Sequence, residues 1–154
     1  MAGYQRNRLF LNLGNNEFTE VGFLEGVDSI YDGYVIATGD VNNDGKMDLF
    51  LRNGDPGSLK YSYPTIQFYE NHFLGKNHSI TLSLRGRESS KNAIGSTVTL
   101  TTDSGKRIKR HLVANNGAAQ SQLLLHFGLG KDKKARSIQV QWPSGKKQNF
   151  GPLK

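Results

Sequence analysis

Short segments of alternating apolar and polar residues run along the chain, and turns rich in glycine and asparagine separate them. Residues 8–13 (RLFLNL) alternate, the turn residues Gly14, Asn15 and Asn16 follow, and residues 17–21 form a second such segment. Two short strands joined by a turn of this composition are typical of a β-hairpin. Further strands are expected at residues 34–38 (YVIAT), 49–51 (LFL) and 65–70 (TIQFYE).

The second half of the chain repeats this pattern more regularly. Six strands are expected, at residues 79–84, 94–101, 106–113, 123–127, 137–142 and near 148–150. Closely spaced strands without a helical period are typical of a β-sandwich. The sequence therefore predicts an all-β protein.

A polar segment, residues 40–48 with the sequence DVNNDGKMD, interrupts the strands of the first half. Oxygen donors at positions 1, 3, 5, 7 and 9 of such a loop can surround a calcium ion. Glycine at position 6 permits the turn with positive φ that brings the later donors back round the ion. The predicted donors are the side chains of Asp40, Asn42, Asp44 and Asp48 and the main-chain carbonyl of Lys46.

This segment differs from an EF-hand loop, which has a helix on each side and a bidentate glutamate at position 12. Here position 12 is Leu51, and both flanking segments have strand patterns. Without that glutamate, three carboxylates suggest a modest affinity for calcium, with Kd about 10⁻⁵ to 10⁻³ M. The alternative is a turn rich in Asn, Asp and Gly that holds no metal.

Charge divides the chain into two regions. Residues 1–75 have five Lys and Arg against ten Asp and Glu, a net −5, whereas residues 76–154 have fifteen against three, a net +12. We expect a domain boundary here, between a calcium-loop region at 1–75 and a sandwich at 76–154. The chain has no cysteine for disulfides, and no apolar run approaches the roughly 18 residues of a membrane span. The apolar segment near the N-terminus is too short for a signal peptide, so we expect a mature fragment or a piece of a longer protein.

Two parts of the sequence resemble known families. NRLFLNLGNNEFTEV and GYVIATGDVNNDGKMDLFL, residues 7–21 and 33–51, are similar to FG-GAP/VCBS propeller repeats. LRGRESSKNAIGSTVTL, LLLHFGLG and IQVQWPSGKKQ, which begin at residues 84, 123 and 138, resemble the ASPIC/UnbV domain of cartilage acidic protein and its bacterial relatives. This resemblance implies one or more partial propeller blades, with the calcium loop, packed against the C-terminal sandwich.

The resemblance also implies a secreted or cell-envelope protein that takes part in binding or adhesion and is not an enzyme. Its Ca²⁺ would have a structural role, and its partner would be a protein or an acidic glycan on a cell surface or in a matrix. The phosphate-loop spacing and the nucleophile elbow GxSxG do not occur in the sequence. The competing hypotheses are a hydrolase fragment and a calcium-dependent module that cleaves itself at Asp55-Pro56.

Two basic clusters raise the question of a polyanion partner. They are Lys106, Arg107, Lys109 and Arg110, and Lys131, Lys133, Lys134 and Arg136. In a strand, residues 107 and 109 share one face and residues 106, 108 and 110 the other. No aromatic residue is interleaved for base stacking, which disfavours nucleic acid. A solvated surface and a surface for acidic glycans both stay open.

Overall fold

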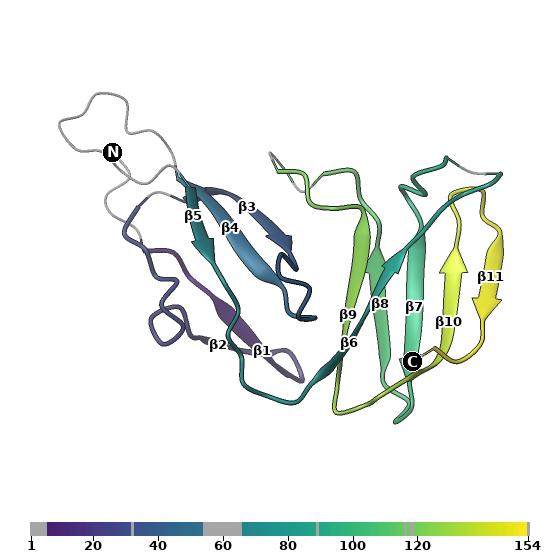
Figure 1. The fold of residues 1–154 in the computed structure, drawn as a ribbon, viewed down its shortest axis with the longest axis horizontal. Helices are drawn as coiled ribbons and strands as arrows, with labels where there is room; N and C mark the ends of the chain where they lie inside the picture. The colour runs from purple at the N-terminus through teal and green to yellow at the C-terminus, as the bar shows by residue number, and fades with distance from the viewer. Residues whose placement is uncertain are drawn as a thin grey trace. The chain divides into compact units, whose positions relative to one another are not determined.

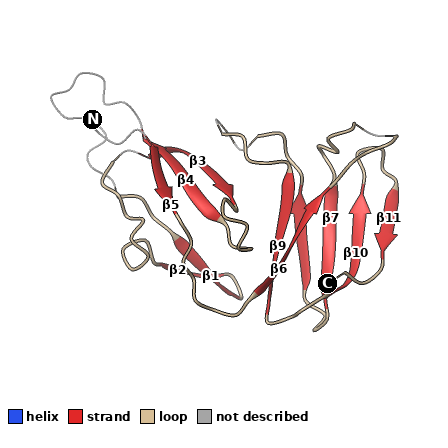
Figure 2. Ribbon diagram, in the orientation of Figure 1, coloured by secondary structure: helices blue, strands red, loops and turns tan. Residues whose placement is uncertain are grey.

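The computed structural model describes residues 6–31, 33–53, 66–88, 90–115, 117 and 119–153. These residues form strands, turns and loops without a helix (Figure 2), so the prediction of an all-β protein is confirmed. Contacts group the chain into two compact units. The first unit comprises Met1–Ala37 and Asp48–Glu70, and the second comprises Thr38–Met47 and Asn71–Lys154.

The first unit contains the predicted hairpin. Strands β1 (Phe10–Gly14) and β2 (Glu17–Glu20) pair in antiparallel fashion. Asn15 and Asn16 form the turn between them with φ of 52° and 63°. Asparagine tolerates this left-handed conformation better than most residues, which explains why the sequence signal was reliable here.

The same unit contains a three-stranded sheet in the order β3-β4-β5. Its strands are β3 (Gly33–Gly39), β4 (Asp48–Asn53) and β5 (Ile66–Tyr69). Phe50 and Phe68 pack across β4 and β5 with ring centroids 4.8 Å apart. Among the described residues of this unit, Leu51 is the one buried hydrophobic side chain. The unit therefore has a small core, and its described strands do not close into a propeller.

The second unit has a four-stranded antiparallel sheet in the order β11-β10-β7-β8 (Figure 1). These strands are β7 (Thr97–Thr102), β8 (Arg107–His111), β10 (Ala135–Gln141) and β11 (Lys147–Phe150). Two further strands, β6 (His78–Ser83) and β9 (Leu124–Gly130), pair with each other. All six strands expected in this half are present. β7 begins three residues later than predicted, since Ala93 and Gly95 adopt φ of 53° and 90° and form a turn.

One hydrophobic core joins the two sheets of the second unit. Val98, Leu100, Ile138 and Val140 supply it from the four-stranded sheet, and Leu125, Phe127 and Leu129 supply it from β9. Leu100 and Phe127 are fully buried. Burial of such a side chain contributes about 1.5–3 kcal/mol. Because strand residues alternate between faces, the other face of the four-stranded sheet is left to polar residues.

Candidate metal centre

The predicted calcium loop joins β3 to β4. Asp40 to Met47 belong to the second unit, whereas Asp48 is the first residue of β4 and belongs to the first unit. The chain turns through Asn43 and Gly45, whose φ values are 59° and 83°. Positive φ at Gly45 is the conformation for which the sequence pattern requires glycine.

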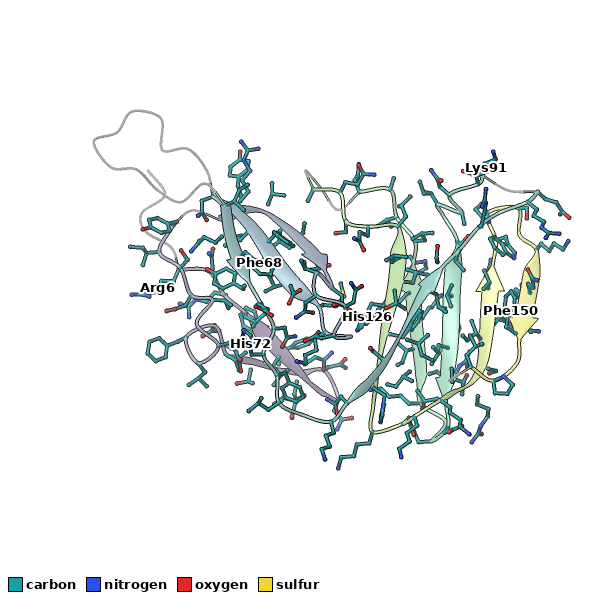
Figure 3. The ribbon with its side chains drawn as sticks, in the orientation of Figure 1. Arg6, Phe68, His72, Lys91, His126 and Phe150 are labelled. Atoms are coloured by element: carbon teal, nitrogen blue, oxygen red, sulfur yellow. The ribbon has the colours of Figure 1, made fainter. Side chains whose placement is uncertain are left out.

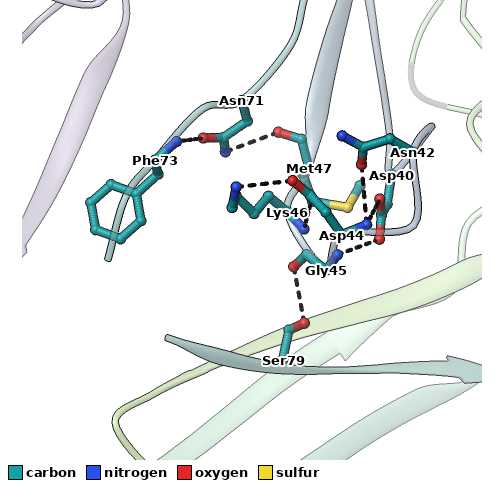
Figure 4. A network of polar contacts seen from close by, with 9 residues as sticks. All are labelled: Asp40, Asn42, Asp44, Gly45, Lys46, Met47, Asn71, Phe73 and Ser79. Carbon is teal, nitrogen blue, oxygen red and sulfur yellow. Dashed lines mark hydrogen bonds and ion pairs between the residues drawn. The ribbon is translucent and has the colours of Figure 1, made fainter. Parts of the chain in front are cut away.

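The side chain of Asp40 organises the loop (Figure 4). Its Oδ1 accepts a hydrogen bond from the Asp44 N–H at 3.0 Å, and its Oδ2 accepts one from the Gly45 N–H at 2.9 Å. The amide oxygen of Asn42 also accepts from the Asp44 N–H, at 3.1 Å. The side chains of Asp40 and Asn42 therefore meet at the main-chain N–H groups of Asp44 and Gly45.

Asp44 has a cation beside it already. Its Oδ2 lies 2.9 Å from the Lys46 ammonium, and its Oδ1 accepts the Lys46 N–H at 2.9 Å. These two hydrogen bonds from Lys46 hold the pKa of the Asp44 carboxyl below its ordinary value. Asp44 is consequently ionised at neutral pH, as a ligand for a hard cation must be.

Two contacts attach the loop to other segments of the second unit. The Ser79 hydroxyl, on β6, donates to the Gly45 carbonyl at 2.9 Å, and the Asn71 amide donates to the Met47 carbonyl at 3.2 Å. A Cβ atom at Gly45 would lie 2.8 Å from the Ser79 oxygen, so a larger residue here would have to displace the Ser79 hydroxyl. Neither Ser79 nor Asn71 was singled out by the sequence, because such contacts depend on the tertiary fold.

The carboxylate and amide oxygens of the loop are the type of ligand that a hard cation prefers. The Lys46 ammonium occupies one of these oxygens in the structure. Each carboxylate oxygen of Asp40 accepts one main-chain hydrogen bond and has a second lone pair. Calcium binding would displace the Lys46 ammonium from Asp44 Oδ2. Asp48 is only 1% exposed, and a carboxylate so buried has to be paired, hydrogen-bonded or bound to metal. Within the described ranges, no three His, Cys, Asp or Glu side chains are grouped as a preformed metal site.

A small cavity of about 140 Å³ lies beside the loop within the second unit, and its lining includes Asp40, Asn43, Thr81, Ser121 and His126. His126, labelled in Figure 3, is half-buried on β9, and its Nδ1 lies 3.2 Å from the Thr81 hydroxyl. Burial lowers the pKa of His126 below its ordinary value, while the charge of Asp40 opposes this shift.

The two basic clusters separate in the structure. Arg107 and Lys109 are on one face of β8, as strand alternation predicts, and Arg110 is on the other. Lys131, Lys133 and Lys134 lie in the connection between β9 and β10. Arg136 is an extra residue in β10, at a bulge in its pairing with β7, and donates to the Asp103 carbonyl. The Asp55-Pro56 bond lies outside the described residues.

Comparison with known families finds both of the resemblances inferred from the sequence, in the same order. Residues 1–51 match the FG-GAP-like repeat, and residues 86–154 match the family described as ASPIC and UnbV. Along the chain, the match to an FG-GAP-like repeat is thus followed by the match to ASPIC and UnbV. The order is the predicted one, and it indicates a β-rich module of the extracellular type.

A search of curated proteins found no match to the chain. In the part that the structure describes, no helix is long and apolar enough to cross a membrane.

Proposed function

We propose that the chain is a calcium-stabilised, non-catalytic binding module of a secreted or cell-envelope protein. In this proposal the FG-GAP-like part contributes blade structure and the ASPIC/UnbV part forms a β-sandwich. The calcium ligands are the side chains of Asp40, Asn42, Asp44 and Asp48 and the carbonyl of Lys46. The observation that carries the proposal is the set of hydrogen bonds that holds three of these side chains on one turn of main chain. Asp40 and Asn42 accept the Asp44 and Gly45 N–H groups, and Asp44 accepts the Lys46 N–H.

The loop's attachments favour a structural role for the ion. The Gly45 and Met47 carbonyls already accept hydrogen bonds from Ser79 and Asn71. An ion bound by the same loop would hold these contacts in place, because fixing the loop lowers the entropy lost on making them. A calcium sensor, in contrast, needs a segment with two conformations, and binding of the ion shifts the equilibrium between them.

Calcium titration tests the proposal directly. Bound metal is measured by calorimetry on the purified chain, and melting curves are recorded in calcium, magnesium and chelator. We expect a Kd of about 10⁻⁵ to 10⁻³ M, a higher melting temperature in calcium, and a smaller effect of magnesium, which requires stricter geometry. An unchanged melting temperature, together with no heat of binding at millimolar calcium, would refute the metal site.

The same samples test the competing enzyme hypothesis. A binding module keeps its intact mass after incubation with calcium, so mass spectrometry should show a single unchanged species. A calcium-dependent pair of fragments separating at Asp55-Pro56 would favour self-processing instead.

A further inference from the structure

The outer face of the four-stranded sheet in the second unit is polar and basic across its whole width. The central row runs from β11 to β8 through Asn149, Gln139, Thr99 and Lys109, which are direct cross-strand partners. Residues directly opposite one another in antiparallel strands point to the same face. Gln139 donates to the Asn149 side-chain oxygen at 3.1 Å, which fixes two of these amides in orientation.

The neighbouring rows continue the same chemistry. One row carries Lys147, Gln141, Thr97 and His111, and the other includes Thr101 opposite Arg107. The Thr97 hydroxyl lies 2.8 Å from His111 Nδ1. None of the residues in these rows is a carboxylate, an aliphatic residue or a Phe, Tyr or Trp. No acidic side chain in these rows is therefore available to pair with the lysine and arginine side chains.

The face is hollowed at its centre. A depression of about 430 Å³ is lined by Thr97, Thr99, Arg107, Lys109, Gln139 and Gln141, and all of these belong to the three rows. The basic and amide side chains are exposed, and the threonines between them are half-buried. Threonine hydroxyls thus form the floor of the depression, and amide and basic side chains border it.

We propose that this face, which we call the polar sheet face, binds a linear acidic polysaccharide. Sugar hydroxyls would bond to the Thr, Gln and Asn side chains, and carboxylate or sulfate groups would pair with Arg107, Lys109 and Lys147. Arginine and lysine form stronger hydrogen bonds with such anions than neutral donors do. The absence of stacking aromatics from these rows argues against single-stranded nucleic acid, which is held largely by base stacking.

The dimensions of the sheet require a chain of several sugars. Lys109 and Lys147 lie on opposite edge strands, separated by three strand spacings or about 14 Å. One small anion cannot reach both edges. Affinity should therefore rise with the length of the oligosaccharide, and inorganic sulfate should compete poorly.

The inference rests on the proposed function only in taking the chain to be a binding module, and it needs no calcium. Binding of heparin oligosaccharides of graded length is measured on the full chain, with dextran as the neutral glycan and poly-dT as the nucleic acid. We expect heparin binding that dextran does not share. With about three charged contacts, the logarithm of affinity should fall with the logarithm of salt with a slope of about −2 to −3.

Two matched variants locate the site. Arg107→Ser/Lys109→Ser removes two charges from the polar sheet face, and Lys131→Ser/Lys133→Ser removes two from the β9–β10 connection. We expect the first to weaken heparin binding about tenfold or more and to bring the salt slope to about −1, while the second changes both little. Gln139→Glu, which puts a carboxylate on the central row, should weaken binding without removing a basic residue.

Equal losses in the two double variants would overturn the proposal, because binding would then follow net charge alone. Binding of poly-dT as tight as that of heparin, or full competition by inorganic sulfate, would also overturn it. All measurements are made in calcium and in chelator. If calcium does not stabilise the chain but heparin still binds, only the metal site is refuted. If calcium stabilises the chain but heparin does not bind, only the polar sheet face is refuted.

Discussion

Replacement of Asp40 by alanine separates what this residue does for the loop from what it does for calcium. Its carboxylate accepts the Asp44 and Gly45 N–H groups at 3.0 and 2.9 Å. Loss of a side-chain oxygen that accepts main-chain N–H groups costs about 0.5–2 kcal/mol where it caps a helix. For two bonds at a half-exposed residue, we expect Asp40→Ala to cost about 1–2 kcal/mol without metal. That corresponds to a melting temperature lower by about 2–8 °C for a chain of this size.

Calcium should add a second, separable effect. At a concentration about 100-fold above Kd, the ion stabilises the wild type by about 2.7 kcal/mol, or roughly 5–10 °C. If Asp40→Ala weakens calcium binding about 100-fold, the same concentration only equals the new Kd. The remaining stabilisation is then RT ln 2, about 0.4 kcal/mol, and the calcium shift falls below about 2 °C.

A second aspartate of the same unit provides the control. Asp132 accepts hydrogen bonds from the Ser104 N–H at 3.2 Å and from its hydroxyl at 2.6 Å, far along the chain from the calcium loop. Asp132→Ala removes the same charge and the same number of hydrogen bonds, so it should lower the melting temperature but leave the calcium shift at its wild-type size. Thermal unfolding of each variant is recorded by circular dichroism, once in calcium and once in chelator. A full calcium shift in Asp40→Ala would refute the assignment of Asp40 as a ligand.

Four further changes test neighbouring parts of the structure. Lys46→Met should lower the calcium Kd a few-fold by calorimetry, because the metal then no longer displaces an ammonium from Asp44. Ser79→Ala should destabilise the fold to urea by about 1 kcal/mol, since the Gly45 carbonyl loses its donor. Leu100→Ala should cost about 2–5 kcal/mol in the same assay, because the side chain is fully buried. Burial lowers the folded-state pKa of His126, so below about pH 6.5 the unfolded chain binds a proton that the folded chain does not. Stability should therefore fall on acidification from pH 7 to 5, and less so in His126→Gln; an equal loss in both proteins would contradict this.

The strands and the loop could be predicted because their signals are local. Turns such as Asn15-Asn16 and Gly45 require a conformation that few residues tolerate, and the residue type reports it directly. Alternation along residues 97–102 places Val98 and Leu100 on the buried face. The start of β7 was missed, since Ile94 is in phase with Val98 and Leu100 in the sequence, whereas positive φ at Ala93 and Gly95 turns the chain there.

The association of the calcium loop with the second unit could not be predicted. Sequence order puts residues 40–47 between two strands of the first unit, and we therefore expected the calcium loop to belong to the region of residues 1–75. The contacts to Ser79 and Asn71 instead group the loop with the C-terminal segment. A serine at a polar position of an alternating strand has no local feature that marks it as a donor to a carbonyl 34 residues away.

The polar sheet face could not be predicted from the sequence either, because it depends on which strands pair. The sequence places Arg107 and Lys109 on one side of their strand, but it does not say which strands lie beside it. In the structure β7 pairs with β10, which follows β9 in the sequence, and β10 pairs with β11. These pairings place Gln139 and Asn149 on the same face of the sheet as Lys109 and Arg107. Before this pairing is known, Arg107 and Lys109 belong to a cluster with Lys106 and Arg110, which mixes both faces of the strand. The strand pairing shows that Arg110 faces the other side of the sheet. It also fixes how far apart the basic side chains of the polar sheet face lie, which the number of charges in the sequence does not give.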